Sequence, residues 1–156
     1  MPVARAVAIA DAVVAQINAA SLGITALRSY ADWDLELQDE TGPRCDVVTN
    51  SVEQKDELAT RGNVKFTVPV DIAIRQKFGE NKRDPTTGRV QLVAVDALIL
   101  LTETVAMLFA GKSSIDGSGV AFAYQDVAIM ANPIRQHLRQ FHQFTSVIRL
   151  TFRTAN

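Results

Sequence analysis

The chain has 156 residues, of which 47% are hydrophobic and 21% charged, close to the averages of soluble globular domains. A chain of this length can bury an independent core, so length and composition exclude a disordered or fibrous protein. With 16 Lys and Arg against 17 Asp and Glu, the formal net charge is -1, which excludes the basic excess typical of nucleic-acid-binding domains. The single cysteine, Cys45, excludes an internal disulfide and a multi-cysteine zinc cage.

The first third of the chain combines a predicted helix with two predicted strands. From Val3 to Ala20 apolar residues recur at helical spacing, and Gly23 follows, which predicts a helix that ends just before it. The N-terminus has no basic start, no long apolar run and no small-residue cleavage site, so we expect no signal peptide. Ile24 to Tyr30 and Arg44 to Thr49 are predicted to be strands.

A run of acidic residues lies between these two strands. Its members are Asp32, Asp34, Glu36, Asp39 and Glu40. A calcium-binding loop needs a turn glycine at its sixth position, and counting from Asp32 that position is Leu37. Trp33, Leu35 and Leu37 alternate with the acids, so we predict an amphipathic edge strand or an extended arm rather than a metal site.

The clearest pattern is a strict alternation of apolar and mostly polar residues from Val64 to Arg75. This period of two predicts a long strand with one buried face. Pro69 has no backbone N–H, so we expect a sheet edge, a bulge or a non-bonded position there. Phe144 to Phe152 alternates in the same way and is the predicted last strand. We expect the polar faces of these two strands to look outward, with the side chains of Lys65, Asp71, Arg75, Arg149 and Arg153.

The segment between these strands is predicted to hold a second main helix. Val90 to Phe109 carries a continuous apolar stripe through Val95, Leu98, Leu101, Val105 and Leu108. Asp96 and Glu103 interrupt the segment, so we predict a buried helix of a soluble protein rather than a membrane span. Residues 79–88 and 112–119 are predicted loops, residues 120–130 a strand, and residues 134–141 one or two helical turns.

This order of elements predicts the α+β class. We expect a single domain over residues 1–156, with an antiparallel or mixed sheet of about five strands. Two main helices should pack on one face of that sheet, because neighbouring strands come in runs between the helices.

No motif for catalysis, cofactor binding or metal binding stands out. His137 and His142 are five residues apart, whereas metal-binding histidines on a helix are usually four apart, so we expect both to be polar surface residues. Lys112, Ser113 and Ser114 follow a helix instead of preceding one, which argues against a phosphate site. We therefore predict a protein that is not an enzyme, with no catalytic residue, no cofactor and no metal.

Several diffuse motifs are spread over nearly the whole chain. They are Ile17 to Ala20, Ala26 to Tyr30, Asp34 to Leu37, Thr60-Arg61, Val70 to Lys77, His137 to Arg139 and Phe144 to Arg153. As a set, these segments resemble the tail-terminator or tail-completion proteins, minor tail proteins of the neck in long-tailed phages.

The resemblance implies a structural virion protein that forms a ring, commonly a hexamer. The ring would cap the tail tube and join it to the head-side connector or stopper protein, so the expected partners are other copies of the chain, the tail-tube protein and that connector. Such a protein is made in the host bacterial cytoplasm and belongs to the tail or neck of the virion. The resemblance implies no membrane and no sequence-specific nucleic-acid binding, although DNA passes through the lumen of such a ring.

Charge patterning suggests where subunits meet. Our hypothesis is that the acidic segment from Asp32 to Glu40 of one subunit contacts the basic strand face of the next subunit or of a tube subunit. The candidate interface residues are Asp32, Trp33, Asp34, Glu36, Arg61, Arg75, Arg149 and Arg153. Surface ion pairs contribute only about 0–1 kcal/mol each, so these charges would set register more than affinity.

Three other interpretations stay open at this point. The chain could be another head–tail connector or minor tail protein. It could belong to a different class, a small α+β ligand-binding or enzymatic domain, which would show a deep pocket with convergent polar groups. It could also be a cellular adaptor outside any virus.

Overall fold

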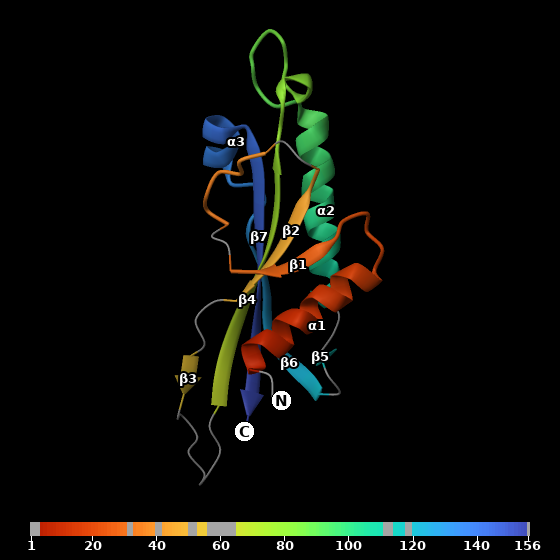
Figure 1. Ribbon diagram of the computed structural model, residues 1–156, viewed down its shortest axis with the longest axis vertical. Coiled ribbons are helices and arrows are strands. Elements are labelled where there is room, and N and C mark those ends of the chain that lie inside the picture. The colour runs from red at the N-terminus through yellow and green to blue at the C-terminus, as the bar shows by residue number, and fades with distance from the viewer. Residues whose placement is uncertain are drawn as a thin grey trace.

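A computed structural model describes residues 4–30, 33–39, 42–49, 53–55, 65–110, 114–117 and 120–155. These residues form one mixed sheet with helices on both of its faces (Figure 1). The elements in chain order are α1 (Arg5–Ala19), β1 (Ala26–Ser29), β2 (Arg44–Thr49), β3 (Glu53–Lys55), β4 (Lys65–Lys77), the 3-10 helix η1 (Glu80–Lys82), α2 (Leu92–Ala110), β5 (Ser114–Gly117), β6 (Val120–Ala131), α3 (Arg135–Phe141) and β7 (Gln143–Ala155).

The sheet has the strand order β1-β2-β4-β7-β6-β5, with β3 also paired to β4. Its centre is the antiparallel pair of β4 and β7, in register from Lys65 opposite Ala155 to Lys77 opposite Gln143. These two strands run along the long axis of the molecule (Figure 1). β1 and β2 are parallel and the other pairs are antiparallel, so the sheet is mixed. The predicted α+β class is confirmed.

Two short strands extend the five that the sequence predicts. β3 follows β2 and pairs with the beginning of β4. β5 lies within the segment Lys112 to Gly119, where we expected only a loop, and pairs with the beginning of β6. That expectation was wrong because the Ser and Gly residues of this segment obscure a strand that forms only by pairing with β6.

Pro69 lies in the middle of the sheet rather than at an edge. On one side it is opposite Thr151 of β7. On the other side β2 pairs as far as Val70 and β3 as far as Thr67, so none of the described residues pairs with Pro69 there. A residue without a backbone N–H fits this break between two partner strands, which corresponds to the third of the three alternatives, a non-bonded position.

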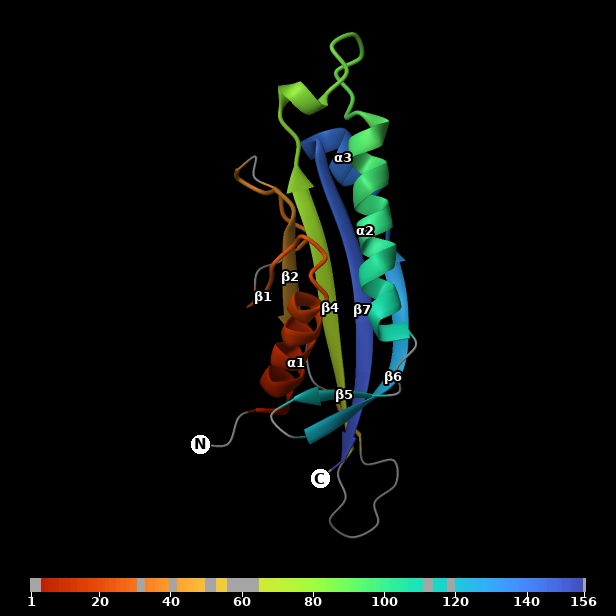
Figure 2. The ribbon, with the colours of Figure 1, turned by 90° about the vertical axis from the view of Figure 1, so that its right-hand side faces the viewer.

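The hydrophobic core lies between the sheet and the helices α1 and α2. Figure 2 shows both helices on the same face of the sheet, as predicted, with α2 over β6 and β7 and α1 towards β1, β2 and β5. Alternate residues of the central strands point into this core, and the buried ones include Val70, Ile72, Ile74, Phe144, Ile148, Leu150 and Phe152. Burying an apolar side chain of this size contributes roughly 1.5–3 kcal/mol, so this layer is the main source of stability.

The polar side of the central strands is buried around Asp71 and Arg75. The prediction that Asp71 and Arg75 look outward is wrong, because their exposed fractions are 0% and 3%. Residues 33–39, which we call the arm, and helix α3 lie over this second face of the sheet (Figure 1). Arg149 is half-buried and Arg153 is exposed, while the side chain of Lys65 lies outside the described residues.

Helix α2 is apolar around most of its circumference but is covered on one side. Its buried residues are Val95, Leu98, Thr102, Val105, Ala106 and Phe109, six of 19. The predicted stripe does face the sheet, although Leu101 and Leu108, at its margin, are only half-buried. Among the described helices, α2 is the one long and apolar enough to cross a membrane by length and composition alone. Here it packs on the sheet with its outer side exposed.

Candidate functional site

Buried polar side chains gather on the second face of the sheet. Strand side chains alternate between faces, so the odd-numbered positions of β4 and β7 point together away from the apolar core. The buried members are Asp46 of β2, Asp71 and Arg75 of β4, Gln143 and Thr145 of β7, and His137 of α3. Two half-buried residues, Lys77 and Arg149, complete the set, which we call the polar layer. Burying such groups is favourable only where each finds a partner.

The deepest charged pair of the polar layer joins Asp46 to Arg75. Arg75 Nη2 lies 2.7 Å from Asp46 Oδ2, and each side chain is 4% exposed. Arg44, on the more exposed side, lies 3.6 Å from the other carboxylate oxygen. The Nε of Arg75 is buried without a partner in the described structure. Arg75 is therefore held within its own sheet by Asp46.

A second pair joins Asp71 to Arg149 directly across β4 and β7. Arg149 Nε donates to Asp71 Oδ1 over 2.8 Å, and Nη2 donates to Oδ2 over 3.1 Å, a bidentate arrangement. The hydrogen bond to Asp71 raises the pKa of Arg149, an effect that its partial burial opposes. Trp33 Nε1 donates to the same carboxylate over 3.3 Å. Asp71 thus links the two central strands to the start of the arm.

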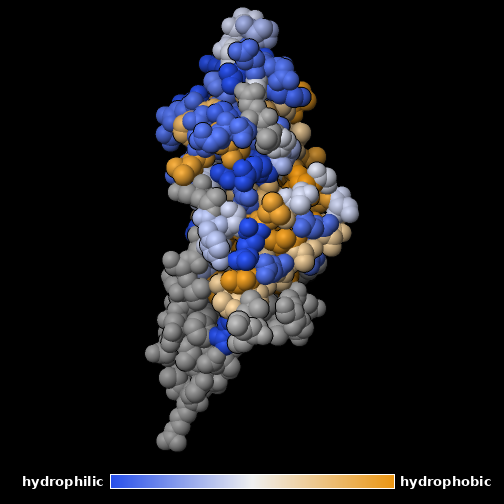
Figure 3. Space-filling model, in the orientation of Figure 1, coloured by the Kyte–Doolittle hydropathy of each residue, from blue (hydrophilic) through white to orange (hydrophobic). Residues whose placement is uncertain are grey.

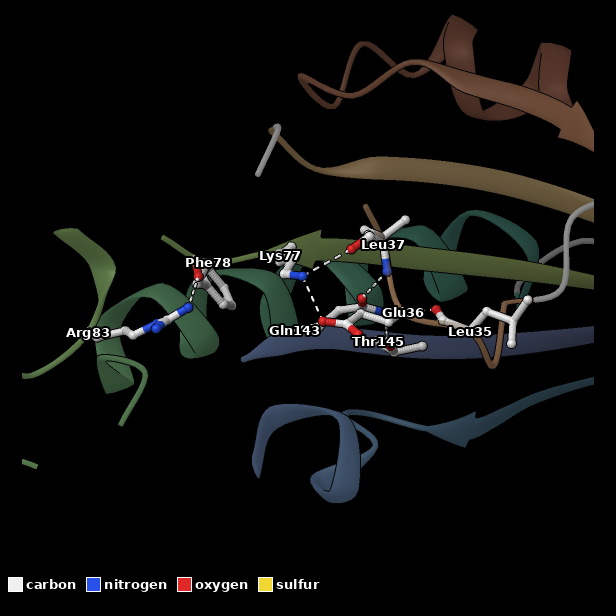
Figure 4. Close-up of polar contacts among 8 residues, drawn as sticks. All are labelled: Leu35, Glu36, Leu37, Lys77, Phe78, Arg83, Gln143 and Thr145. Atoms are coloured by element: carbon white, nitrogen blue, oxygen red, sulfur yellow. Dashed lines mark hydrogen bonds and ion pairs between the residues drawn. The ribbon is translucent and has the colours of Figure 1, made fainter. Parts of the chain in front are cut away.

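Gln143 and Lys77, which are opposite each other on β7 and β4, hold the rest of the arm (Figure 4). The backbone N–H of Leu37 donates to Gln143 Oε1 over 2.7 Å. Gln143 Nε2 donates to Thr145 Oγ1 over 2.9 Å and to the carbonyl of Leu35 over 3.5 Å. Lys77 Nζ contacts Glu36 Oε1 at 2.7 Å and donates to the carbonyl of Leu37 over 3.2 Å. The arm is therefore bound through its backbone as well as its charges.

His137 fastens α3 to the same layer. Its Nδ1 lies 2.7 Å from Thr145 Oγ1, and its Nε2 lies 3.3 Å from Asp34 Oδ1 on the arm. The residue is 4% exposed, so the expectation of a surface histidine is wrong; α3 packs on β7 and turns this side chain inward. His142, at the end of α3, is half-buried and has a left-handed backbone with φ 50°. In the described part of the chain, no group of three or more His, Cys, Asp or Glu could hold a metal ion.

The eight predicted interface residues have different surroundings. Asp32 and Arg61 lie outside the described residues. Trp33, Asp34, Glu36 and Arg149 contact groups of their own subunit, as given above, and Arg153 is exposed near the end of β7. Arg75 has little surface to offer a partner, because it is 3% exposed and Asp46 binds its guanidinium inside the subunit. The acidic segment and the polar strand face do come together, and within one subunit.

Sequence reasoning missed Asp46, Lys77 and Gln143. Asp46 stands between Cys45 and Val47 in a short strand, where alternation places it on the opposite face from those two core residues. Gln143 precedes the alternating run of the last strand, and nothing in its neighbours indicates burial. What brings these residues together is strand register, which the sequence alone does not show.

An open groove of about 530 Å³ lies apart from the polar layer, between the loop before α2 and the end of α3. Its lining residues are Thr87, Gly88, Arg89, Val90, Leu92, Val95, Leu138, Arg139 and His142. In Figure 3 the end of the molecule formed by this loop and α3 is largely hydrophilic. The lining of the groove combines apolar side chains with the guanidinium groups of Arg89 and Arg139.

The fold and the polar layer define an α+β protein whose second sheet face is closed by its own arm and by α3. The buried acids, bases and amides of the layer bind one another and the arm. The layer therefore holds the arm and α3 against the sheet. No protein-family model matches the chain, and no curated protein matches it.

Proposed function

We propose that this chain is a structural protein of the neck of a long-tailed phage. Copies of it assemble into a ring, commonly a hexamer in the proteins it resembles, that caps the tail tube and joins it to the head-side connector. The motifs that carry this resemblance extend over nearly the whole chain, from α1 to β7. The work is mechanical, so it requires binding surfaces and a stiff subunit.

The observation that carries the proposal is the outer side of α2. Val93, Leu100 and Met107 are 80%, 64% and 71% exposed. They are seven residues apart, and because seven residues make nearly two helical turns, they form one stripe along the helix. A helix that is apolar on two opposite sides is suited to lie between two protein layers, and one layer is this sheet. The outer stripe is therefore a surface for assembly.

The polar layer supports the same function by stiffening the subunit. Paired charges and a fastened arm on one face, with a packed core on the other, hold β4 and β7 as a rigid pair of long strands. A ring subunit that contacts a tube on one side and a connector on the other needs such a body. In this proposal the protein is located in the virion tail or neck.

Native mass spectrometry of the purified chain, with negative-stain images of the same samples, tests the proposal. We expect closed rings of one defined size, because a repeated contact between identical subunits closes when its rotation permits. A chain that stays monomeric at every concentration, and also in the presence of isolated tail-tube ends, would contradict it. Rings that bind a connector but no tube would favour another head–tail connector.

The groove beside α3 supports a second candidate from a different class, a small α+β ligand-binding domain. Arg89 and Arg139 line the groove together with apolar residues such as Val90 and Leu138, which suits a small anionic molecule with an apolar part. The same mass spectra discriminate the two: a monomer that retains a small molecule after desalting favours this candidate.

A further inference from the structure

We propose that the outer stripe of α2 in one copy binds the β1 edge of the next copy, so that the subunits join head to tail. This inference rests on the ring-forming function proposed above and names the two surfaces that would make the ring. It replaces the acidic segment as the centre of the contact, because that segment is already bound within its own subunit.

The distribution of exposed apolar side chains identifies the two surfaces. In the described parts of the chain, large apolar side chains that are exposed lie in three places: on α2 and β6, on and just after β1, and at one position of the arm. They are Leu92, Val93, Leu100, Met107, Ile129 and Met130; Leu27 and Tyr30; and Leu35. The first two groups lie at opposite edges of the sheet, since β1 ends the strand order on one side and β6 lies near its other end.

The α2 surface extends onto the neighbouring strand. α2 packs over β6 and β7, and Asn132, just after β6, donates to the carbonyl of Ile99 over 3.4 Å. Ile129 and Met130 of β6, which come shortly before Asn132, are 44% and 55% exposed. We call Val93, Leu100, Met107, Ile129 and Met130 the α2 surface.

Charge argues against two α2 surfaces binding each other. The exposed acids Asp96 and Glu103 flank the stripe, Asp126 is exposed on β6, and α2 contains no Lys or Arg. Two α2 helices packed antiparallel about Leu100 would bring Asp96 of each copy close to Glu103 of the other, and like charges there cost affinity. The α2 surface therefore fits a partner that is apolar and carries a cation.

The β1 edge has both properties. Leu27 and Tyr30 are 61% and 71% exposed, and Arg28 lies between them. Arg28 Nη1 donates to Tyr30 Oη over 2.8 Å, its Cζ lies 5.6 Å from the centroid of the Tyr30 ring, and its Nε lies 3.1 Å from Asp11 of α1. Tyr and Arg are the side chains that most often dominate binding energy, and here they are held in place before binding.

The outer side of β1 has no strand partner among the described residues, since β1 pairs with β2 alone. The side chain of Asn18 of α1 binds the backbone N–H and carbonyl of Ala26 at the beginning of β1, over 2.8 and 3.2 Å. The surface offered to a partner therefore consists of the exposed side chains of Leu27, Arg28 and Tyr30. Because the two surfaces lie at opposite edges of one sheet, a copy cannot satisfy both by itself. The contact must repeat from copy to copy, which is the condition for a ring.

Two double variants test the pairing. The α2 variant carries Leu100→Glu and Met107→Glu; the β1 variant carries Leu27→Glu and Tyr30→Ser. Each should raise the dissociation constant of the subunit contact at least about 100-fold, because it removes two apolar anchors from one surface. All four positions are more than half exposed, so circular dichroism and melting temperature should match those of the wild type. A control matched to the α2 variant, Gln136→Glu with Gln140→Glu, adds the same two negative charges on the exposed side of α3 and should assemble normally.

Mixing the two variants gives the sharpest result. The α2 variant keeps its β1 edge and the β1 variant keeps its α2 surface, so an equimolar mixture contains one intact pairing. We expect a one-to-one heterodimer that does not grow into a ring, measured by native mass spectrometry or sedimentation. An interface between two α2 surfaces would instead leave the β1 variant able to assemble like the wild type, and that result would overturn the inference.

The outcomes separate this inference from the proposed function. Wild-type rings together with rings of either variant would overturn the pairing and leave the ring function standing. A wild-type chain that stays monomeric, with and without tube ends, would overturn both. Binding of the wild type to phospholipid vesicles, lost in the α2 variant while rings persist, would assign the stripe to a lipid surface and overturn the pairing.

Discussion

At the scale of single residues, the pair of Asp46 and Arg75 is the most demanding feature of the polar layer. Replacing Arg75 by Ala leaves a buried carboxylate without its partner, so we expect a loss of about 3–5 kcal/mol in the free energy of unfolding. Urea denaturation monitored by circular dichroism measures this change. The physical reason is desolvation: the charge of Asp46 stays out of water after the guanidinium is gone.

Arg44→Ala is the matched control for that prediction. Arg44 lies 3.6 Å from the same carboxylate, but its side chain is 49% exposed, so its removal should cost no more than about 1 kcal/mol. The double variant Asp46→Ala with Arg75→Ala should lose less free energy of unfolding than the sum of the losses of Asp46→Ala and Arg75→Ala alone. In the double variant neither charge is left buried without its partner. Equal losses for Arg44→Ala and Arg75→Ala would contradict this account of the layer.

Cys45 gives the molecule a dependence on alkaline pH. Burial, and after it the charge of Asp46, raises the pKa of Cys45 from 9.0 to about 12. The unfolded chain therefore releases this proton at a lower pH than the folded one, and fewer protons are bound in the unfolded state. The free energy of unfolding should be unaffected by the thiol below about pH 9 and fall as pH rises from there towards 12.

Comparison with Cys45→Ala measures the effect. Urea denaturation at several values from about pH 8 to 10 should show a steeper loss of stability in the wild type than in the variant. The cavity left by Cys45→Ala lowers stability by a similar amount at every pH, so it does not change the slope. Parallel curves would show that the thiol ionises equally easily in both states.

At the scale of elements, the arm is the segment whose position depends most on a few contacts. Gln143→Ala removes the acceptor of the Leu37 N–H and the donor to the Leu35 carbonyl. We expect a loss of about 1–3 kcal/mol in the free energy of unfolding, because buried backbone groups are left unsatisfied. Relative to the wild type, the rate of hydrogen exchange measured by mass spectrometry should increase more in residues 33–39 than in β4 and β7.

Gln140→Ala is the control for this variant, because Gln140 is exposed on α3 and accepts a hydrogen bond from Gln136 of the same helix, away from the arm. It should leave exchange in the arm unchanged. An arm that exchanges as slowly in Gln143→Ala as in the wild type would mean that Lys77 and Trp33 hold it without help from Gln143.

Helix α2 has two apolar stripes on opposite sides, with different roles. Val95, Leu98 and Val105 form the stripe that packs on the sheet, and Val93, Leu100 and Met107 form another on the outer side. A search of the sequence for one apolar stripe finds the first and does not separate the second from it. Only the exposure of the second stripe in the folded subunit shows that it is available to bind a partner.

At the scale of the whole molecule, the two faces and the two edges of the sheet have different roles. One face is covered by α1 and α2 and provides the core. The other is covered by the arm and α3 and is held by paired charges and hydrogen bonds. With much of both faces covered, the edges of the sheet, the outer side of α2 and exposed positions such as Arg153 are surfaces that a neighbouring copy can reach. The ring measurement proposed above tests this division directly.

Local sequence pattern predicted the elements well where it was regular. The second predicted strand, Arg44 to Thr49, matches β2 in both bounds, and the strand from Val64 to Arg75 differs from β4 by one or two residues at each end. The longer segment alternates between apolar and mostly polar residues, which is typical of a strand with one buried face, and the shorter one contains the β-branched pair Val47 and Val48. Agreement was poorest at β5, where four residues form a strand only because β6 lies beside them.

The candidate site was predicted only in part. The hypothesis from the sequence placed the acidic segment of one subunit against the basic strand face of another subunit, whereas the contacts of Trp33 with Asp71 and of Glu36 with Lys77 lie within one subunit. Nor did the sequence indicate that Arg75 and His137 are buried. The charge pattern shows which surfaces can attract each other. Whether the two surfaces meet within one copy or between two copies depends on where the folded chain places them.

By itself, the sequence of this protein determined the α+β class, the long central strands and the positions of α1 and α2, because these follow from the periodicity of apolar residues along a local segment. Only the tertiary structure decided which polar residues are buried, where the arm binds and which side of α2 stays exposed. Those properties depend on strand register and on segments distant in the chain that cover a face, and a side chain such as Arg75 has the same local sequence whether or not anything covers it.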